Sequence, residues 1–161
     1  GETLTALGFD VAGWSRTAKE IPGITCFDDR GGLDAILGRS HILICLLPLT
    51  PETEGILNAE LFSKLPKGAH LINAARGGHL VEHDLIPALD SGRLAHATLD
   101  VFRTEPLPGD HPFWDHPRIT VTPHNASITD PRSVARQIVQ GIACSARGDD
   151  VPNTVDVARG Y

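Results

Sequence analysis

The sequence predicts an α/β fold with a doubly wound parallel sheet, in which helices cover both faces of the strands. Short apolar runs alternate along the chain with segments of helical periodicity, which is the pattern of successive βαβ units. Several of these runs are apolar almost throughout, as expected of parallel strands that are buried on both faces. The 161 residues, 41% of them hydrophobic, suffice for one domain with a packed core.

The expected strands and helices follow one another in regular order. The predicted strands span residues 11–14, 41–46, 70–74, 95–101 and 119–122. The predicted helices span residues 3–7, 33–37, 59–65, 82–89 and 132–146. The third helix has the clearest ends, because Asn58 is a good N-cap residue and Pro66 stops the helix.

Two segments depart from this regular pattern. Pro87 lies inside the fourth predicted helix, where it removes a hydrogen-bond donor, so this helix either begins late or is kinked. Residues 103–118 are rich in Pro, His and Asp, and we expect them to form a long surface loop. Long loops in compact domains often carry function.

Composition narrows the possible classes of function. The net charge of −6 disfavours binding to nucleic acid or to an anionic membrane. No apolar run approaches the roughly 18 residues that span a bilayer. The three cysteines are widely spaced and form no C-x-x-C motif, so a disulfide framework and a zinc site are disfavoured and a reducing cytoplasm is favoured. The chain begins Gly1-Glu2-Thr3, and we expect it to be cut at its front.

Three polar residues follow three successive predicted strands: Arg76, Glu105 and His124. In open α/β sheets ligands bind outside the carboxyl ends of the strands, so these side chains are expected to share one pocket. Arg presents a planar fork of donors to a carboxylate, and His is the natural acid or base near neutral pH, with Glu105 fixing its tautomer. The pattern fits a pocket in which Arg76 anchors a 2-oxo acid and His124 protonates its carbonyl oxygen as hydride arrives.

Taken singly, each of these three residues could equally be an ordinary exposed loop residue. The sequence gives less support to other kinds of functional site. His79 and His83 lie four residues apart but lack the H-E-x-x-H order of a zinc-binding helix. No G-x-S-x-G nucleophile elbow occurs, which disfavours a serine hydrolase. Trp114, in the long loop, could form a wall of the substrate pocket.

Several segments together resemble the D-isomer-specific 2-hydroxyacid dehydrogenases in order and spacing. They are Leu47-Pro48-Leu49-Thr50-Pro51-Glu52-Thr53, residues 71–78 with Leu80-Val81-Glu82, residues 99–108 and residues 122–129. These segments extend over most of the chain, so the resemblance is specific. Residues 155–161 and Phe113-Trp114-Asp115-His116-Pro117 are most similar to the branch of this family that reduces glyoxylate and hydroxypyruvate.

The resemblance implies a Rossmann-like cofactor domain and a role for individual residues. Arg76 would bind the substrate carboxylate, and His124, polarised by Glu105, would be the acid/base. Cofactor contacts would come from Leu47, Pro48, Ala74, Ala75, Arg76, Asp100 and His124, with Asp100 holding the nicotinamide carboxamide.

The resemblance also implies a truncated fold. The family's first strand and its G-x-G-x-x-G turn are missing here, as is most of the substrate domain. Residues 1–127 would then be a partial NAD(P)-binding domain, and residues 128–161 a C-terminal helix and tail that belong to the substrate domain. Asn125 follows the expected acid/base His where the family usually has an apolar residue.

The end of the first predicted strand bears on the choice of cofactor. An NAD-specific fold usually places Asp or Glu there to bind the ribose 2′-hydroxyl. This chain has Ser15, Arg16 and Thr17 instead, which suit a 2′-phosphate, although an exposed turn could carry the same residues. The sequence therefore favours NADP over NAD.

The leading hypothesis is an NADP-preferring reductase of glyoxylate or hydroxypyruvate. It would be a cytoplasmic homodimer, because family members usually pair through the cofactor domain. Two alternatives stay open. Without the phosphate-binding turn, the chain could be an inactive fragment or a binding or assembly module. It could also be an NAD-dependent dehydrogenase of another 2-hydroxy acid, such as phosphoglycerate.

Overall fold

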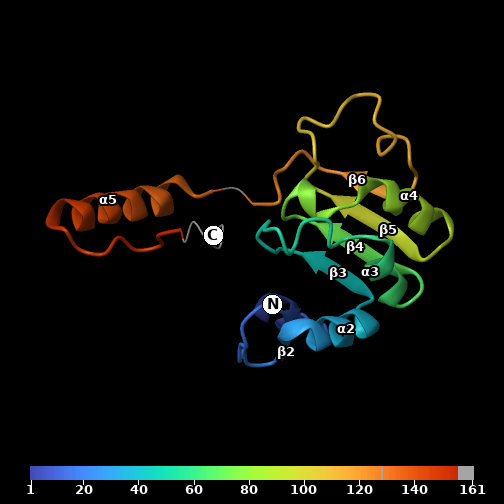
Figure 1. The fold of residues 1–161 in the computed structure, drawn as a ribbon, viewed down its shortest axis with the longest axis horizontal. Helices are drawn as coiled ribbons and strands as arrows, with labels where there is room; N and C mark the ends of the chain where they lie inside the picture. The colour runs from blue at the N-terminus through green and yellow to red at the C-terminus, as the bar shows by residue number, and fades with distance from the viewer. Residues whose placement is uncertain (128, 156–161) are drawn as a thin grey trace.

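The computed structural model describes residues 1–127 and 129–155, and its named strands pair in parallel (Figure 1). A small sheet pairs β1 (Ala12–Trp14) with β2 (Thr25–Phe27). The larger sheet has the order β3 (Ile42–Cys45), β4 (Ala69–Asn73), β5 (Leu94–Leu99) and β6 (Ile119–Val121), which leaves β3 and β6 as its edge strands. The predicted α/β class with parallel strands is confirmed.

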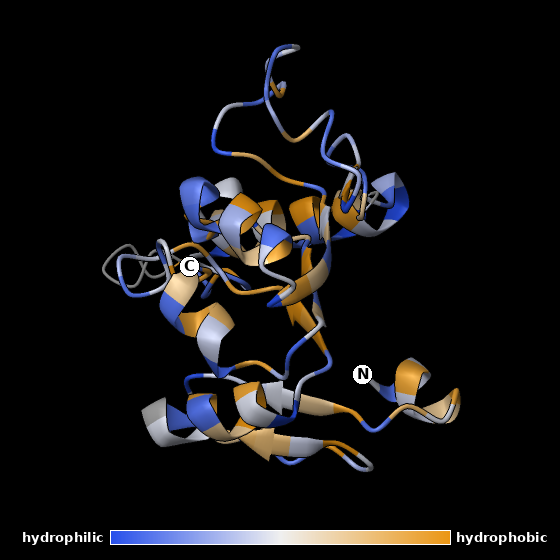
Figure 2. Ribbon diagram, turned by 90° about the vertical axis from the view of Figure 1, so that its right-hand side faces the viewer, coloured by the Kyte–Doolittle hydropathy of each residue, from blue (hydrophilic) through white to orange (hydrophobic). Residues whose placement is uncertain are grey.

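Helices α3 (Ala59–Lys64) and α4 (Glu82–Asp90) pack on one face of the larger sheet and enclose the core. The core residues from these elements are apolar and almost fully buried: Leu61, Phe62, Leu85, Leu89, Leu71, Leu94, Ala97 and Leu99. Figure 2 shows the strands of this sheet as mainly hydrophobic ribbons. Asn58 caps α3 as predicted, because its side chain accepts a hydrogen bond from the backbone N–H of Leu61 at 3.0 Å.

The opposite face of the larger sheet is open among the described residues. Ile42 and Ile44 of β3 are 50% and 41% exposed, and His70 and Thr120 on the neighbouring strands are exposed as well. The strand register places these residues on the same side. Burial on both faces was expected from the apolar runs, but the structure shows it on one face only.

Two short helices lie early in the chain, α1 (Glu2–Ala6) and α2 (Asp29–Arg39). Helix α2 packs against β1, β2 and α3. It begins four residues earlier than predicted. Gly31 and Gly32 weaken the helical pattern of the sequence, but the first turn of the helix tolerates them. The three-residue strand β2 was missed altogether, since so short a run has no readable period.

Pro87 lies inside α4, so the late start considered for this helix is wrong. The proline ring is on the exposed side of the helix. The carbonyl group that loses its helical donor belongs to His83, which is also exposed, so water can hydrogen-bond to it. The cost of the proline is reduced because it falls on the solvent side.

Helix α5 (Pro131–Arg147) lies apart from the sheets (Figure 1). Asp130 caps its start by accepting from the N–H groups of Arg132 and Ser133, and Gly148 ends it at φ 75°. None of its residues is buried, and the apolar side chains Ile138, Val139 and Ile142 are 56–66% exposed.

Residue 128 and residues 156–161 lie outside the described residues, and with them most of the chain ending that contributed to the family resemblance. Within the described part, no helix combines the length and apolar character needed to cross a membrane.

Candidate active site

The structure brings the three predicted residues together. Arg76 follows β4, Glu105 lies in the loop after β5, and His124 follows β6, so that three parallel strands deliver them to one edge of the sheet. They share a hollow of about 280 Å³ with Leu49, Gly77, Gly78, Phe102 and Arg103. This is the arrangement expected of ligand-binding residues in an open parallel sheet.

His124 and Glu105 form a hydrogen-bonded pair. The Nδ1 atom of His124 lies 2.8 Å from Oε2 of Glu105, and Oε1 of Glu105 accepts from the backbone N–H of Phe102 at 2.9 Å. The hydrogen bonds from His124 and Phe102, with the charges of His124 and Arg76, outweigh burial and lower the pKa of Glu105. The carboxylate therefore stays ionised and holds the Nδ1 proton, which leaves Nε2 of His124 for exchange with a ligand.

His124 has a left-handed backbone, with φ 52°, which a residue other than glycine rarely adopts and which costs about 1–3 kcal/mol. Asp100 compensates for this strain. Its buried carboxylate accepts from the hydroxyl of Thr122, from the N–H of Asn125 at 3.0 Å and from the N–H of Ala126 at 2.9 Å. The loop that carries His124 is thus fixed on both sides of this residue.

Burial alone would raise the pKa of Asp100, but the hydrogen bonds from Thr122, Ala126 and Asn125 and the charge of His124 bring it below its ordinary value. Asp100 is therefore an ionised anchor for the His124 loop. The sequence suggested a different role, contact with the nicotinamide carboxamide, and that role stays a prediction.

The backbone around Arg76 is positioned by Asn73, which is fully buried. Asn73 accepts from the N–H of Ala75 at 3.2 Å and donates from its amide nitrogen to the carbonyl oxygen of Arg76 at 3.1 Å. The guanidinium group of Arg76 is exposed and donates to the carbonyl oxygen of Ala75 at 2.6 Å. The backbone is therefore held rigidly, while the side chain reaches into the hollow.

The predicted cofactor-binding residues also follow strands. Ser15, Arg16 and Thr17 come after β1, Leu47 and Pro48 after β3, and Ala74 and Ala75 after β4. A hydrogen bond from Thr50 chiefly lowers the pKa of Glu52, and the charge of Arg16 lowers it further, so Arg16 lies near the turn after β3. Ser15 donates its hydroxyl to the carbonyl oxygen of Thr17 at 2.8 Å. The predicted contacts of these residues with the cofactor stay a prediction.

Trp114 is not among the residues that line the hollow, and its role as a wall of the substrate pocket stays a prediction. Its indole N–H donates to the carbonyl oxygen of Pro108 at 2.7 Å, and half of the residue is exposed. The neighbouring Phe113 is buried in the core instead. Together these contacts hold Trp114 within its own loop.

Arg103 lines the hollow and was missed in the sequence. Its guanidinium group lies 3.4 Å from the carboxylate of Glu54 and 3.4 Å from the carbonyl oxygen of Gly78. A single basic residue in a polar loop carries no signal that would distinguish it from surface arginines. Its proximity to Arg76 adds positive charge to the hollow.

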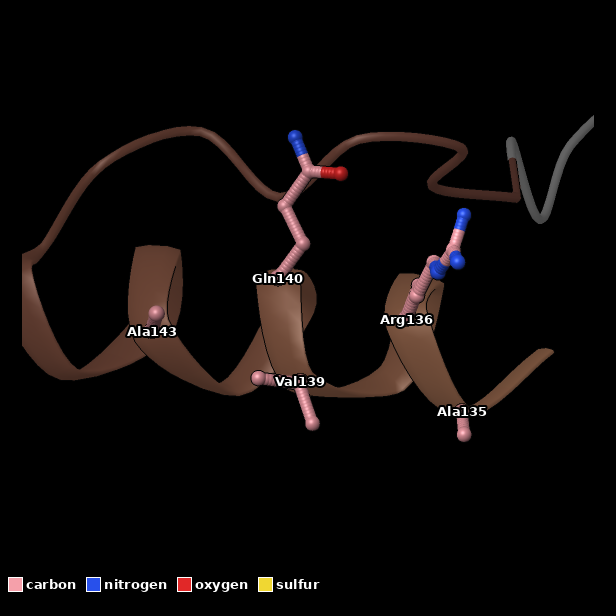
Figure 3. A pocket seen from close by; sticks show the side chains of 5 residues that line it. All are labelled: Ala135, Arg136, Val139, Gln140 and Ala143. Carbon is pink, nitrogen blue, oxygen red and sulfur yellow. The ribbon is translucent and has the colours of Figure 1, made fainter. Parts of the chain in front are cut away.

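A second hollow, of about 390 Å³, runs along α5 and is shown in Figure 3. Val139 and Ala135 point to one side of the helix, while Gln140 and Arg136 point to the other. The residues that line this hollow offer no acid, base or nucleophile that could act on a substrate, because the one ionisable side chain among them, Arg136, stays protonated. The described residues also contain no cluster of three or more His, Cys, Asp or Glu side chains that could hold a metal ion.

A parallel α/β sheet with polar residues gathered at the carboxyl ends of its strands is the architecture of the Rossmann-like, dinucleotide-binding domains. The sequence profile of one such domain, the NAD binding domain of the D-isomer specific 2-hydroxyacid dehydrogenases, matches residues 1–126. The chain belongs to this family.

Its similar relatives include proteins from several bacteria. Glyoxylate/hydroxypyruvate reductase A of Serratia proteamaculans is 53% identical over 160 residues, which are 99% of this chain and 51% of the relative. A D-isomer specific 2-hydroxyacid dehydrogenase from Xanthobacter autotrophicus, solved with NADPH and MES, is 51% identical with a TM-score of 0.94, covering 98% of this chain and 65% of that chain. The NADPH-dependent glyoxylate/hydroxypyruvate reductase of Sinorhizobium meliloti, solved with NADP and sulfate, is 45% identical with a TM-score of 0.93. The match covers 99% of this chain and 52% of that chain. The chain spans about half the length of the curated relatives that it matches.

Proposed function

We propose that the protein reduces glyoxylate or hydroxypyruvate to the corresponding 2-hydroxy acid, with the D configuration where the product is chiral, by hydride transfer from NADPH. The observation that carries this proposal is the pairing of His124 with Glu105 in the same hollow as Arg76. An acid/base that lies beside a carboxylate-binding cation is what reduction of a 2-oxo acid requires. The names of the reductases in Serratia and Sinorhizobium support the choice of substrates.

In the proposed mechanism, Arg76 binds the substrate carboxylate through its planar fork and thereby fixes the direction of the 2-oxo group. The bound cofactor supplies the hydride that the carbonyl carbon receives. His124 gives the proton on Nε2 to the carbonyl oxygen, and the imidazole becomes neutral while its Nδ1–H stays hydrogen-bonded to Glu105. Glu105, ionised because its pKa is lowered, stabilises the charged imidazole before this transfer.

The residues present fit NADPH at the adenosine end. Residues 15–17, directly after β1, contain no acid that would repel a 2′-phosphate, and Arg16 supplies a cation there. Arg16→Ala is expected to raise the KM for NADPH while the KM for NADH changes little. Lys19→Ala, which removes a cation close by in the sequence, is the matched control. A rise of equal size for both cofactors would contradict the assignment of Arg16.

The test of the main proposal is the oxidation of NADPH, followed by its absorbance, in the presence of either oxo acid. His124→Gln is expected to lower kcat by about two to four orders of magnitude, the usual contribution of general acid catalysis. Arg76→Ala should chiefly raise the KM for the oxo acid. His83→Ala, at an exposed histidine outside the hollow, serves as the control. An unchanged kcat in His124→Gln together with an unchanged KM for the oxo acid in Arg76→Ala would refute the proposal.

The rival hypothesis is that these 161 residues are an inert fragment or a binding module. A titration of the chain itself with NADPH separates the two. Binding in the micromolar range would reject the inert interpretation, whereas absence of binding together with absence of turnover would support it.

We further propose that residues 1–127 form one domain and that 128–161 belong to another, with a homodimer formed through the first. The support within the described residues is that α5 has no buried residue although it carries a row of apolar side chains. Such a row usually packs against another element. Sedimentation equilibrium would test the dimer, and limited proteolysis between residues 123 and 130 would test the boundary.

A further inference from the structure

His79 is a fully buried histidine beside the candidate active site, and the proposed mechanism does not use it. It ends the short helix η1 (Gly77–His79), three residues after Arg76, and its exposed fraction is 0%. Its Nδ1 lies 3.0 Å from the carbonyl oxygen of Arg76. Its Nε2 lies 3.3 Å from the carbonyl oxygen of Pro48, in the turn after β3. One imidazole thus touches a residue in its own segment, three positions away, and a residue 31 positions away in the chain.

Neither carbonyl group depends on this ring for a hydrogen bond. The oxygen of Arg76 also accepts from the amide of Asn73 at 3.1 Å, and the oxygen of Pro48 accepts from the hydroxyl of Thr53 at 2.7 Å. A carbonyl oxygen is only an acceptor and a neutral imidazole carries one N–H, so the neutral ring donates to one of the two carbonyl groups and lies in contact with the other. Both carbonyl groups thus have a hydrogen-bond donor other than the imidazole. The effect of the imidazole is to link the two segments and to fix their separation.

The segments that it links are the two that carry the predicted contacts to the ligands. The turn with Pro48 is expected to contact the cofactor, and Arg76 is expected to bind the substrate carboxylate. The same turn carries Leu49, which lines the hollow and lies so close to Gly78 that an added Cβ there would be 2.9 Å from Leu49 Cδ2. A change in the separation of the two segments would move both sides of the hollow.

We propose that His79 is a positioning residue that fixes the separation of the cofactor side and the substrate side of the site, because its buried ring lies between the Pro48 turn and the Arg76 segment and donates to one of their two carbonyl groups. The kinetic part of this inference rests on the proposed function. The structural part, the link between the two segments, does not.

Two isosteric substitutions separate the two contacts. The amide of Asn reaches the position of Nδ1, so His79→Asn keeps the contact to Arg76 and loses the one to Pro48. The amide of Gln reaches the position of Nε2, so His79→Gln does the reverse. We expect only the variant that loses the donated hydrogen bond to change. His79→Asn raises the KM for NADPH by about two- to tenfold if Nε2 is the donor, and His79→Gln raises the KM for the oxo acid by a similar factor if Nδ1 is the donor, with kcat nearly unchanged in both.

Amide hydrogen exchange on the 161-residue chain gives a readout that needs no turnover. The N–H groups of Thr53 and Glu54 in the turn should exchange faster in His79→Asn if Nε2 is the donor, and those of Ala75 and Leu80 should exchange faster in His79→Gln if Nδ1 is the donor. The same two substitutions at the exposed His83 are the control and should change neither group.

The outcomes distinguish the two proposals. A change in exchange and in KM that is confined to one variant, and to the segment whose contact that variant loses, supports the link. Equal behaviour of the two variants would overturn it, because a residue that only fills buried space has no reason to separate them. A change in exchange confined to one variant, in a protein that reduces neither oxo acid, would support the link and reject the proposed function.

Discussion

Gly77 shows how tightly the candidate active site is assembled, and its replacement by alanine gives a sharp test. A Cβ atom at this position would lie 1.9 Å from the carbonyl carbon of Phe102, 2.1 Å from its oxygen and 2.3 Å from the nitrogen of Arg103. Ordinary contact begins at 3.4 Å, so the shortest distance must grow by 1.5 Å. The obstructing atoms belong to the backbone, so no side-chain rotation can relieve the clash.

We expect Gly77→Ala to lower the free energy of unfolding by at least about 3 kcal/mol, the upper end of the usual cost of overpacking, because two backbone segments must separate. Since globular domains are stable by about 5–15 kcal/mol, this loss is large. The displaced segment includes the N–H of Phe102, which holds Glu105, so the contact from Glu105 to His124 should also be disturbed. Urea denaturation followed by circular dichroism measures the change.

Gly109→Ala is the matched control, because an added Cβ there meets no atom within 4 Å. It should change the free energy of unfolding by less than about 0.5 kcal/mol, as is usual for surface substitutions. If Gly77→Ala were equally harmless, the close approach of residues 77 and 102 would not exist in solution, and the reasoning about this site would be refuted.

Three further substitutions test individual contacts. Asp100→Asn should lower the free energy of unfolding by about 1.5–3 kcal/mol, because a buried anion loses charge-assisted hydrogen bonds. It should also slow turnover, because the loop that carries His124 is no longer held. Urea denaturation measures the first effect and enzyme kinetics the second. Glu105→Gln should destabilise the protein at neutral pH, and the difference from the unsubstituted chain should vanish in acid. The pKa of Glu105 is lowered in the folded protein. Its contribution to the free energy of unfolding is therefore present above the unfolded pKa of about 4.3 and is lost as the pH falls through the folded pKa. Urea titrations at several pH values would show this loss. Pro87→Ala should raise the thermal midpoint, since it restores an N–H donor inside α4, and a lowered midpoint would contradict this account.

Much of the fold and the catalytic trio could be predicted from the sequence because both follow from strand ends. Apolar runs locate the strands of the larger sheet to within one or two residues, and the polar residue after each run must lie at the carboxyl edge of a parallel sheet. Arg76, Glu105 and His124 were found in this way before their distances were known. The family resemblance then gave each a role.

Other parts of the site could not be predicted because they depend on contacts between distant segments. Asp100 is an anchor for the His124 loop only because residues 122–126 fold back over its carboxylate. Arg103 lines the hollow because Gly77 lets the two backbones approach. Likewise, nothing in the sequence around His79 indicates that its ring meets Pro48. Such contacts are decided by packing, which local patterns do not record.

The edge position of β3 has a practical consequence. An edge strand offers unpaired N–H and C=O groups to any extended chain, and proteins usually protect such edges with charges or prolines. Residues 42–45 contain neither, and Ile42 and Ile44 of this strand are 50% and 41% exposed. The 161-residue chain should therefore aggregate as its concentration rises, by intermolecular strand pairing along β3, and crystallisation or NMR work on it will benefit from dilute, cold handling and from early light-scattering controls.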